Sequence, residues 1–478
     1  MGTNAEIPGA TIGWRCFSRI QRPPGASGSA EPFRPRPMHL RLLVCALALA
    51  LPPLARSAAP AAAKPNLIFI LADDYGIGEV GCYGSDHFRT PNLDALARGG
   101  TRYTHAFTIS LCGPSRAQIL TGRYGFRTGG TNQDAVGKIS PRQEKLIPTV
   151  LKPAGYVSTM IGKWSQFSQQ PSDFGFDDYL RYAGSGAYWN TQEKVRTYVV
   201  NGETRPLRDR EYLPDLMHQH LVDFMTRHRD RPFYAHYSLS HVHGEILPTP
   251  DSAPDSKDHY GDNVRYMDKL VGRLMAELDR LQLREKTLVL FFGDNGTTNG
   301  RAERATIGGR QLAGAKGSVL EGGGRVPLIA SWPGVVPAGR VSADLVDSSD
   351  FLPTFAELAG APLPVNTVID GRSLAAQLRG EKGGPRTWVF HQLARNWYVR
   401  EAGWKLNQAG ELFDMSDAPF VEKPVPAGTE TPAALAARRR LAAALAELNP
   451  AGGIPDTGDE SGRHAKNVEE RKQKGRAK

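Results

Sequence analysis

The amino-acid sequence predicts an α/β fold, with a large, mostly parallel β-sheet flanked by helices and a small antiparallel sheet toward the C-terminus. Three observations lead to this prediction. Four short apolar runs each stop abruptly at polar residues, as buried parallel strands do. An amphipathic helical pattern separates the last two runs. After Pro364 the sequence changes to short aromatic segments separated by turn residues, which is typical of antiparallel strands.

The four apolar runs end in side chains that can do chemistry. The runs span residues 66–72, 156–161, 233–240 and 287–292. They are followed by Asp73-Asp74, Gly162-Lys163, His241-Val242-His243 and Asp294-Asn295. Ligands of open parallel sheets bind beyond the carboxyl ends of the strands. The four endings therefore predict an active site at one edge of the sheet.

The remaining elements follow from patterning. The helix between the third and fourth runs presents one apolar face, made of Val264, Met267, Val271, Leu274, Leu278 and Leu281. Strands of the small sheet are expected at residues 388–390, 397–399 and 404–406. An Ala-rich helix is expected at 433–448, before a polar tail that we expect to be disordered. These changes divide the chain into a main domain at 64–364, a subdomain at 365–420, and a helix with its tail at 421–478.

The N-terminal region has the pattern of a secretory signal. Residues 38–63 contain a charged start, an apolar run from Leu42 to Leu54 and a small-residue cleavage region. The run is too short to cross a membrane, so we expect export without a membrane span. Residues 1–37 lack periodicity and are expected to be a disordered, non-native extension upstream of the start at Met38.

The charge distribution argues against a nucleic-acid partner. The 478 residues carry a formal net charge of +10, of which +5 lies in residues 1–62 and +3 in residues 421–478. A nucleic-acid binder concentrates positive charge on its folded part. Here the basic residues are peripheral, and the sequence predicts no such partner.

The most informative stretch is Ser110-Leu111-Cys112-Gly113-Pro114-Ser115-Arg116, continued by Ala117-Gln118-Ile119-Leu120-Thr121-Gly122. Pro114 indicates the start of a helix. Cys112 is therefore expected just before a helix N-terminus, where an anion is favoured. Two other interpretations stay open. Cys112 could be a buried structural cysteine, or it could form a disulfide with Cys82.

These residues resemble the first signature of the type I sulfatases of the alkaline phosphatase superfamily, Cys-x-Pro-Ser-Arg with Thr-Gly five residues after the Arg. The likeness covers about residues 64–415. It implies an alkaline-phosphatase-like fold and makes 64–364 the sulfatase catalytic domain. It also implies that a formylglycine-generating maturation enzyme oxidises Cys112 to Cα-formylglycine, whose hydrate is the nucleophile.

The resemblance also implies the roles of the residues at the strand ends. Asp73, Asp74, Asp294 and Asn295, together with the modified Cys112, resemble the ligands of a calcium ion, and oxygen donors suit this hard cation. An Asp pair after a strand is otherwise often only a cap or a turn. Lys163 and Lys316 look like the two lysines that hold the sulfate. His243 resembles the general acid, and Arg116 is expected to brace the nucleophile and the metal.

One position departs from the family. The second signature of the type I sulfatases contains the residues Gly-Lys-Trp-His. This chain has Gly162-Lys163-Trp164-Ser165 at the corresponding positions. The missing histidine helps to expel sulfate in the family, and serine cannot accept a proton near neutral pH. Three outcomes are open: another group such as His241 substitutes, turnover is slow, or the protein is no longer a hydrolase.

The sequence thus predicts hydrolysis of sulfate esters to an alcohol and inorganic sulfate, with a sulfated carbohydrate as the expected substrate. A phosphonate monoester or phosphodiester hydrolase and a non-catalytic sulfated-glycan binder are the alternatives. We expect substrate specificity to depend on loops such as residues 181–208 and the segment after Asn295. Neither segment contains a recognisable sequence motif for a particular substrate. The sequence does not disclose which sulfated compound is the substrate.

Overall fold

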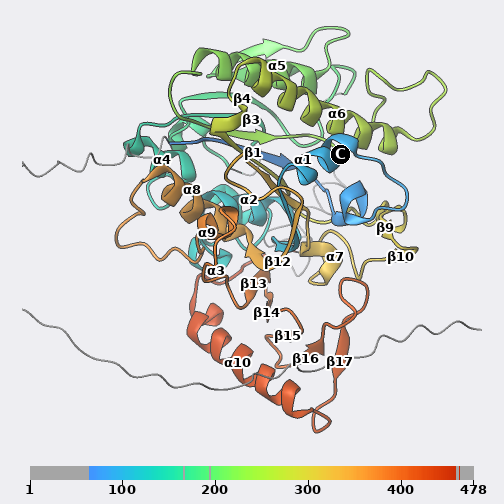
Figure 1. Cartoon of the computed structure of the whole chain (residues 1–478), viewed down its shortest axis with the longest axis vertical. Coiled ribbons are helices and arrows are strands. Elements are labelled where there is room, and N and C mark those ends of the chain that lie inside the picture. Colours follow the sequence, from blue (N-terminus) through green and yellow to red (C-terminus); the bar gives the residue numbers. More distant parts are fainter. Residues whose placement is uncertain (1–63, 165–166, 193–194, 459–461, 463–478) are drawn as a thin grey trace, which may run out of the picture. The chain divides into compact units, whose positions relative to one another are not determined.

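The computed structural model describes residues 64–164, 167–192, 195–458 and 462 (Figure 1). The expected extension at 1–37, the signal segment at 38–63, Ser165 and most of the polar tail lie outside the described residues. Their assignments therefore stay predictions. The described residues all belong to one compact unit.

A ten-stranded mixed sheet runs through this unit in the order β12-β2-β11-β8-β1-β7-β3-β4-β5-β6. Its strands are β1 Asn66–Ala72, β2 Thr101–Phe107, β3 Val157–Lys163, β4 Asp178–Tyr182, β5 Thr197–Val200, β6 Glu203–Pro206, β7 Phe233–Ser238, β8 Thr287–Gly293, β11 Leu328–Ser331 and β12 Arg340–Asp347. Neighbours from β8 through β1, β7 and β3 to β4 pair in parallel. Strands β11, β5 and β6 pair antiparallel with their neighbours. The predicted, mostly parallel sheet is confirmed.

Helices cover both faces of the sheet (Figure 1). Successive residues of β1 alternate between two apolar cores, with Ile68 and Ile70 in one and Leu67 and Phe69 in the other. The first core includes α1 Pro91–Arg98, α5 Leu213–Arg227 and α6 His259–Arg280. The second includes α2 Cys112–Thr121, α4 Ile147–Leu151, α8 Phe351–Ala359 and the end of α9 Ala375–Leu378. The shorter elements are α3 Gly125–Thr128, α7 Glu321–Gly324, β9 Thr306–Ile307 and β10 Arg310–Gln311.

The predicted elements agree with the structure to within a few residues. Strand β1 has the predicted bounds, and α6 buries the predicted face except for Leu281, which ends the helix as a half-buried cap. Strand β3 continues to Lys163, so this lysine is the last residue of the strand rather than a residue beyond it. Strand β7 ends at Ser238, two residues earlier than predicted.

A second, five-stranded sheet follows in the sequence, and all its pairs are antiparallel. Its strands are β13 Val389–Leu393, β14 Asn396–Arg400, β15 Trp404–Asn407, β16 Leu412–Asp414 and β17 Lys423–Val425. Helix α10, Pro432–Leu448, packs on this sheet through a separate apolar cluster that includes Phe390, Val399 and Leu441. The small antiparallel sheet is confirmed, whereas the domain boundaries at 364 and 420 stay predictions.

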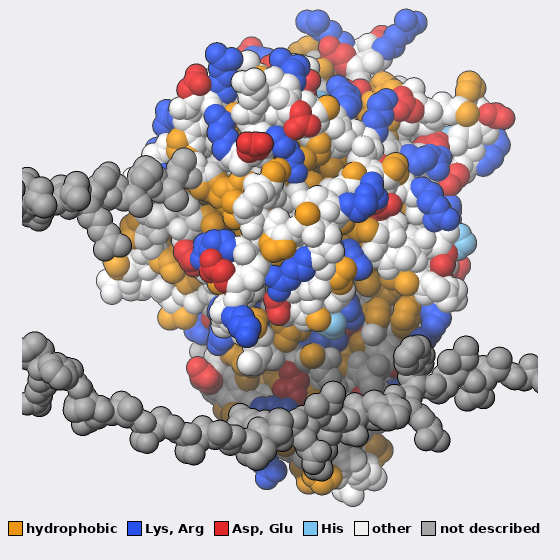
Figure 2. All heavy atoms as spheres, in the orientation of Figure 1, with side chains coloured by type: hydrophobic (Ala, Val, Ile, Leu, Met, Phe, Trp, Pro, Cys, Tyr) orange, Lys and Arg blue, Asp and Glu red, His pale blue; other side chains and the backbone are white. Residues whose placement is uncertain are grey.

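Acidic and basic side chains are interspersed on the face shown in Figure 2. Within the described residues, none of the helices combines the length and the apolar character that a membrane span requires.

Candidate active site

Two neighbouring strands bring four predicted ligands together. Strands β1 and β8 pair in parallel with Ala72 opposite Gly293, so the residues that follow each strand emerge side by side. The amide of Asp294 donates to the carbonyl of Ala72 at 2.9 Å, and the amide of Asp74 donates to Oδ1 of Asp294 at 3.0 Å. Asp73, Asp74, Asp294 and Asn295 are all buried. The predicted acidic cluster at this edge of the sheet is therefore present.

Three buried or nearly buried cations balance the three carboxylates. Lys163 donates to both oxygens of Asp73, at 2.9 and 2.7 Å. Arg116 donates to Oδ2 of Asp294 from Nε at 2.9 Å and from Nη2 at 2.7 Å. Lys316 forms an ion pair with Asp74. Burial of an isolated charge is costly, and this pairing offsets part of that cost.

Lys163 and Asp73 stabilise each other's charged form. Burial opposes the charged forms of both groups, but it is outweighed by the nearby charges taken together: those of Lys163, His243 and Arg116 around Asp73, and chiefly those of Asp73 and Cys112 around Lys163. The pKa of Asp73 is lowered below its usual value, and the pKa of Lys163 is raised above its own. Both side chains therefore stay charged across the physiological pH range.

Cys112 is the first residue of α2, which begins two residues before Pro114, the helix start predicted from the sequence. The amide of Ser115 already donates to the carbonyl of Leu111 at 3.1 Å, which closes the first turn. Cys112 is buried, and its Sγ, together with carboxylate oxygens of Asp73 and Asp294, forms a group of atoms all within 4.8 Å of one another. No disulfide joins Cys112 to Cys82.

Gln133 holds the beginning of α2. Its Oε1 accepts a hydrogen bond from the amide of Gly113 at 3.0 Å, and its Nε2 lies 3.4 Å from Sγ of Cys112. The side chain therefore caps the helix N-terminus and fixes the position of the cysteine. No sequence pattern marks this residue as part of the site.

His243 follows β7 and approaches the acidic cluster from the other side. Its Nε2 lies 3.7 Å from Oδ2 of Asp74. Burial lowers the pKa of His243, although the charge of Asp73 acts in the opposite direction. The side chain keeps 21% of its surface exposed, so it remains accessible to a ligand.

His241 does not fit the role of a substitute base. Its Nε2 lies 2.9 Å from the hydroxyl of Tyr212, and its ring packs against the rings of Tyr188, Tyr212 and Tyr266. Burial lowers the pKa of His241 to about 3. The structure therefore argues against the open alternative in which His241 substitutes for the missing histidine.

A cavity of about 240 Å³ opens onto the site. Its lining includes Cys112, Gln133, Asp134, Ser185, His243 and Lys316. Lys163 and Arg116 are not among the lining residues; both are buried and contact the acidic cluster. Ser185, in the loop after β4, is a second residue that no motif identifies and that only the folded chain brings to the cavity.

The four strand-end residues suit a hard divalent cation. They offer carboxylate and amide oxygens, which calcium prefers. Oδ1 of Asn295 is buried and has no hydrogen-bond partner among the described residues, while Nδ2 of the same amide donates to Asp74 at 2.9 Å. A buried acceptor without a donor is unfavourable unless a cation or another donor meets it. Asp73, Asp74, Asp294 and Asn295 could therefore hold a metal ion.

Comparison with known proteins gives a consistent result. The family model described as Sulfatase matches residues 65–361. Human arylsulfatase A is 36% identical over 364 residues, covering 69% of this chain and 70% of that protein. Mouse steryl-sulfatase is 33% identical over 471 residues, covering 78% of this chain and 75% of the relative.

Comparison with solved structures also finds proteins of similar fold. Ps i-CgsB in complex with k-i-k-neocarrahexaose has a TM-score of 0.71 and 25% sequence identity, and the match covers 87% of this chain and 98% of that one. The family model covers more than half of the chain, and the signature at Cys112 lies beside the acidic cluster. The chain belongs to the sulfatase family.

Proposed function

We propose that the protein hydrolyses sulfate esters with a formylglycine residue made from Cys112 and a calcium ion held by Asp73, Asp74, Asp294 and Asn295. One observation carries the proposal. The first residue of α2, Cys112, opens on a cavity together with Lys316 and His243, directly beside three carboxylates that three cations balance. A nucleophile, anion-binding groups and an acid thus meet in one place.

The charge of the cluster suits an anionic substrate. Three carboxylates and three cations leave no net charge, so a divalent cation would add two positive charges beside Cys112. When bound, calcium would neutralise the charge that develops on the nucleophile and the sulfate. Lys316, which lines the cavity, and Lys163, which is buried, are the groups proposed to hold the sulfate oxygens.

Other residues of the chain take part in the attack on sulfur, in protonation of the leaving group and in positioning. The aldehyde hydrate would supply one hydroxyl to attack sulfur and a second whose collapse releases sulfate. His243, which faces the cavity, protonates the departing alcohol oxygen. Arg116 positions Asp294 relative to α2 through its two hydrogen bonds. The net reaction consumes one water and yields an alcohol and inorganic sulfate.

A sulfated carbohydrate is the substrate class that we propose. A structural relative was solved in complex with an oligosaccharide, and the signal pattern at 38–63 supports export to where such polymers occur. The proposal also requires a formylglycine-generating maturation enzyme as a partner.

Turnover of three ester types by protein co-produced with that maturation enzyme tests the proposal. We expect hydrolysis of 4-nitrophenyl sulfate to exceed that of bis(4-nitrophenyl) phosphate and of a phenylphosphonate monoester, and we expect Cys112→Ala to abolish it. Faster turnover of the phosphorus esters would identify a phosphodiester or phosphonate hydrolase instead. Binding of sulfated glycans without any turnover would identify a non-catalytic binder.

A further inference from the structure

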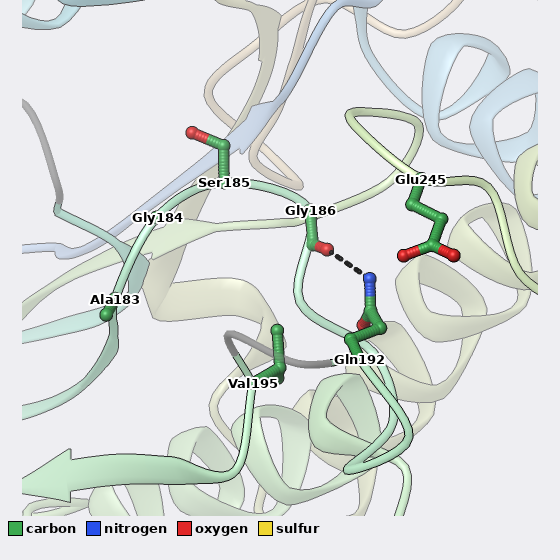
Figure 3. A pocket seen from close by; sticks show the side chains of 7 residues that line it. All are labelled: Ala183, Gly184, Ser185, Gly186, Gln192, Val195 and Glu245. Carbon is green, nitrogen blue, oxygen red and sulfur yellow. Dashed lines mark hydrogen bonds between the residues drawn. The ribbon is translucent and has the colours of Figure 1, made fainter. Parts of the chain in front are cut away.

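Figure 3 shows the lining of a second cavity. It has a volume of about 300 Å³, and its lining includes Ala183, Ser185, Gly186, Gln192, Val195 and Glu245. Ser185 lines both cavities, which makes them neighbours. The catalytic cavity alone, at about 240 Å³, is smaller than the roughly 300–1,000 Å³ of typical small-molecule sites. A substrate larger than one sulfated group therefore needs the additional space.

The wall between the two cavities is built from backbone in close contact. A Cβ atom on Gly186 would lie 2.1 Å from the carbonyl oxygen of His243, so only glycine fits there. The φ of Gly186 is also positive, at 69°, a conformation that glycine adopts without strain. The loop after β4 is thus packed directly against the segment that carries His243 and Glu245.

Gln192 fixes the shape of this loop. Its Oε1 accepts hydrogen bonds from the amides of Tyr188 at 2.8 Å and Trp189 at 3.3 Å, and its Nε2 donates to the carbonyl of Gly186 at 3.0 Å. The hydroxyl of Tyr188 in turn donates to the carbonyls of Ser240 and His243, both at 3.0 Å. These hydrogen bonds hold the part of the cavity wall from Gly186 to Gln192 in place without a ligand.

The residues that line the second cavity determine which kind of ligand can bind there. The apolar side chains among the named lining residues are Ala183 and Val195, and no aromatic ring is among them. Glu245 is exposed and points toward Gln192 in Figure 3, and it forms no ion pair within the described part of the chain. An apolar occupant would strip water from this carboxylate without replacing its hydrogen bonds. A second anionic group would be repelled by it.

A carboxylate accepts hydrogen bonds from hydroxyl groups, and a neutral sugar offers several of them. We propose that the second cavity binds a neutral sugar residue attached to the sulfated one, and that Glu245 accepts hydrogen bonds from its hydroxyl groups. The site then prefers a monosulfated saccharide of two or more residues over a sulfated monosaccharide and over a saccharide with sulfate on both residues. This inference deepens the proposed function and depends on it.

Competition against 4-nitrophenyl sulfate turnover tests the inference. The probes are galactose monosulfates, lactose monosulfates that carry the sulfate at the same position of galactose, and lactose disulfates with a further sulfate on glucose. Inhibition constants are measured for the matured wild-type protein, for Glu245→Gln and for Glu411→Gln. Glu411 is an exposed carboxylate between β15 and β16, outside the segments expected to set specificity, and serves as the matched control.

For at least one sulfate position, we expect the lactose monosulfate to bind about tenfold more tightly than the galactose monosulfate, which is the scale of one hydrogen bond to a charged group. Glu245→Gln should lose this advantage, and its affinities for the disulfate and the monosulfate should become more similar. Glu411→Gln should behave like the wild type. Equal inhibition by every galactose and lactose pair in the wild type, or an advantage that survives in Glu245→Gln, would overturn the inference. If 4-nitrophenyl sulfate is not hydrolysed at all, the proposed function fails, and calorimetric dissociation constants for the same probes still decide the role of the cavity.

Discussion

Arg116 donates two hydrogen bonds to a single oxygen of Asp294, and both side chains are buried. A third hydrogen bond from the same guanidinium reaches the carbonyl of Lys163 at 3.2 Å. One side chain of α2 thereby connects the helix that carries Cys112 to the ends of β8 and β3. The relative position of the nucleophile and the acidic cluster depends on this connection.

Removing Arg116 should destabilise the protein strongly. Arg116→Ala leaves the buried carboxylate of Asp294 without its arginine partner, and breaking a buried pair in this way costs about 3–5 kcal/mol. Urea unfolding measures the loss. Arg229→Ala, at an exposed arginine, is the control and should stay within about 0.5 kcal/mol of the wild type. An equally small effect of Arg116→Ala would contradict the structural role given to this residue.

Calcium should stabilise the protein and support its activity. A ligand that binds only the folded state at 100 times its dissociation constant adds about 2.7 kcal/mol of stability. We expect calcium to raise the melting temperature of chelator-treated protein and to restore turnover, and we expect both effects to be much weaker in Asp294→Asn. Asp230→Asn, at a carboxylate that is 90% exposed, should respond like the wild type. If Asp294→Asn bound calcium with unchanged affinity, the assignment of the ligands would be wrong.

Glu79 should make stability depend on pH. Burial raises the pKa of Glu79 from 4.5 to about 7, despite hydrogen bonds that the carboxylate accepts from Thr297 and Tyr260. The folded state thus holds this proton more tightly than the unfolded chain. The stability that Glu79 contributes through its raised pKa is fully present below pH 4.5, and it is lost as the pH rises through about 7.

Glu79→Gln removes that titration while keeping a side chain of the same shape. Relative to the wild type, the variant should gain about 3 kcal/mol of unfolding free energy as the pH rises across this window. Denaturant unfolding at a series of pH values measures the difference. Parallel pH profiles for the wild type and Glu79→Gln would show that Glu79 is ionised throughout.

His243 should matter most for substrates with poor leaving groups. A general acid contributes about 10²–10⁴ in rate when the departing oxygen needs a proton. We therefore expect His243→Ala to slow the hydrolysis of sugar or alkyl sulfates far more than that of 4-nitrophenyl sulfate, whose leaving group departs without help. Steady-state kinetics across a series of leaving groups measures this. A uniform loss for all leaving groups would assign His243 to substrate binding instead.

The sequence predicted those parts of the molecule that depend on local patterns. Buried parallel strands appear as uninterrupted apolar runs, so the bounds of β1 were found without error and those of β3, β7 and β8 nearly so. Residues that follow parallel strands meet at one edge of the sheet, and for this reason Asp73, Asp74, Asp294 and Asn295 could be grouped in advance.

The parts that the sequence did not reveal depend on long-range contacts. Gln133 lies in a loop without a motif and reaches the cavity only through packing of distant segments. Ser185 lies in the segment 181–208, where specificity was expected, but no motif singles out this residue. The buried carboxyl of Glu79 follows the Asp pair but is defined by Thr297 and Tyr260, which lie about two hundred residues away. The role of Ser165 remains a sequence-based prediction, because that residue lies outside the described part of the chain.

The proposed mechanism depends on the conversion of Cys112 to the aldehyde that attacks sulfate esters. Mass spectrometry of the peptide spanning Ser110 to Arg123 tests this conversion most directly, on protein produced with and without a formylglycine-generating enzyme. We expect the peptide to carry formylglycine at Cys112 only after co-production, and we expect turnover of 4-nitrophenyl sulfate to rise in proportion to the converted fraction. A peptide that keeps unmodified cysteine after co-production, in a protein that still hydrolyses the ester, would show that Cys112 is not the source of the nucleophile.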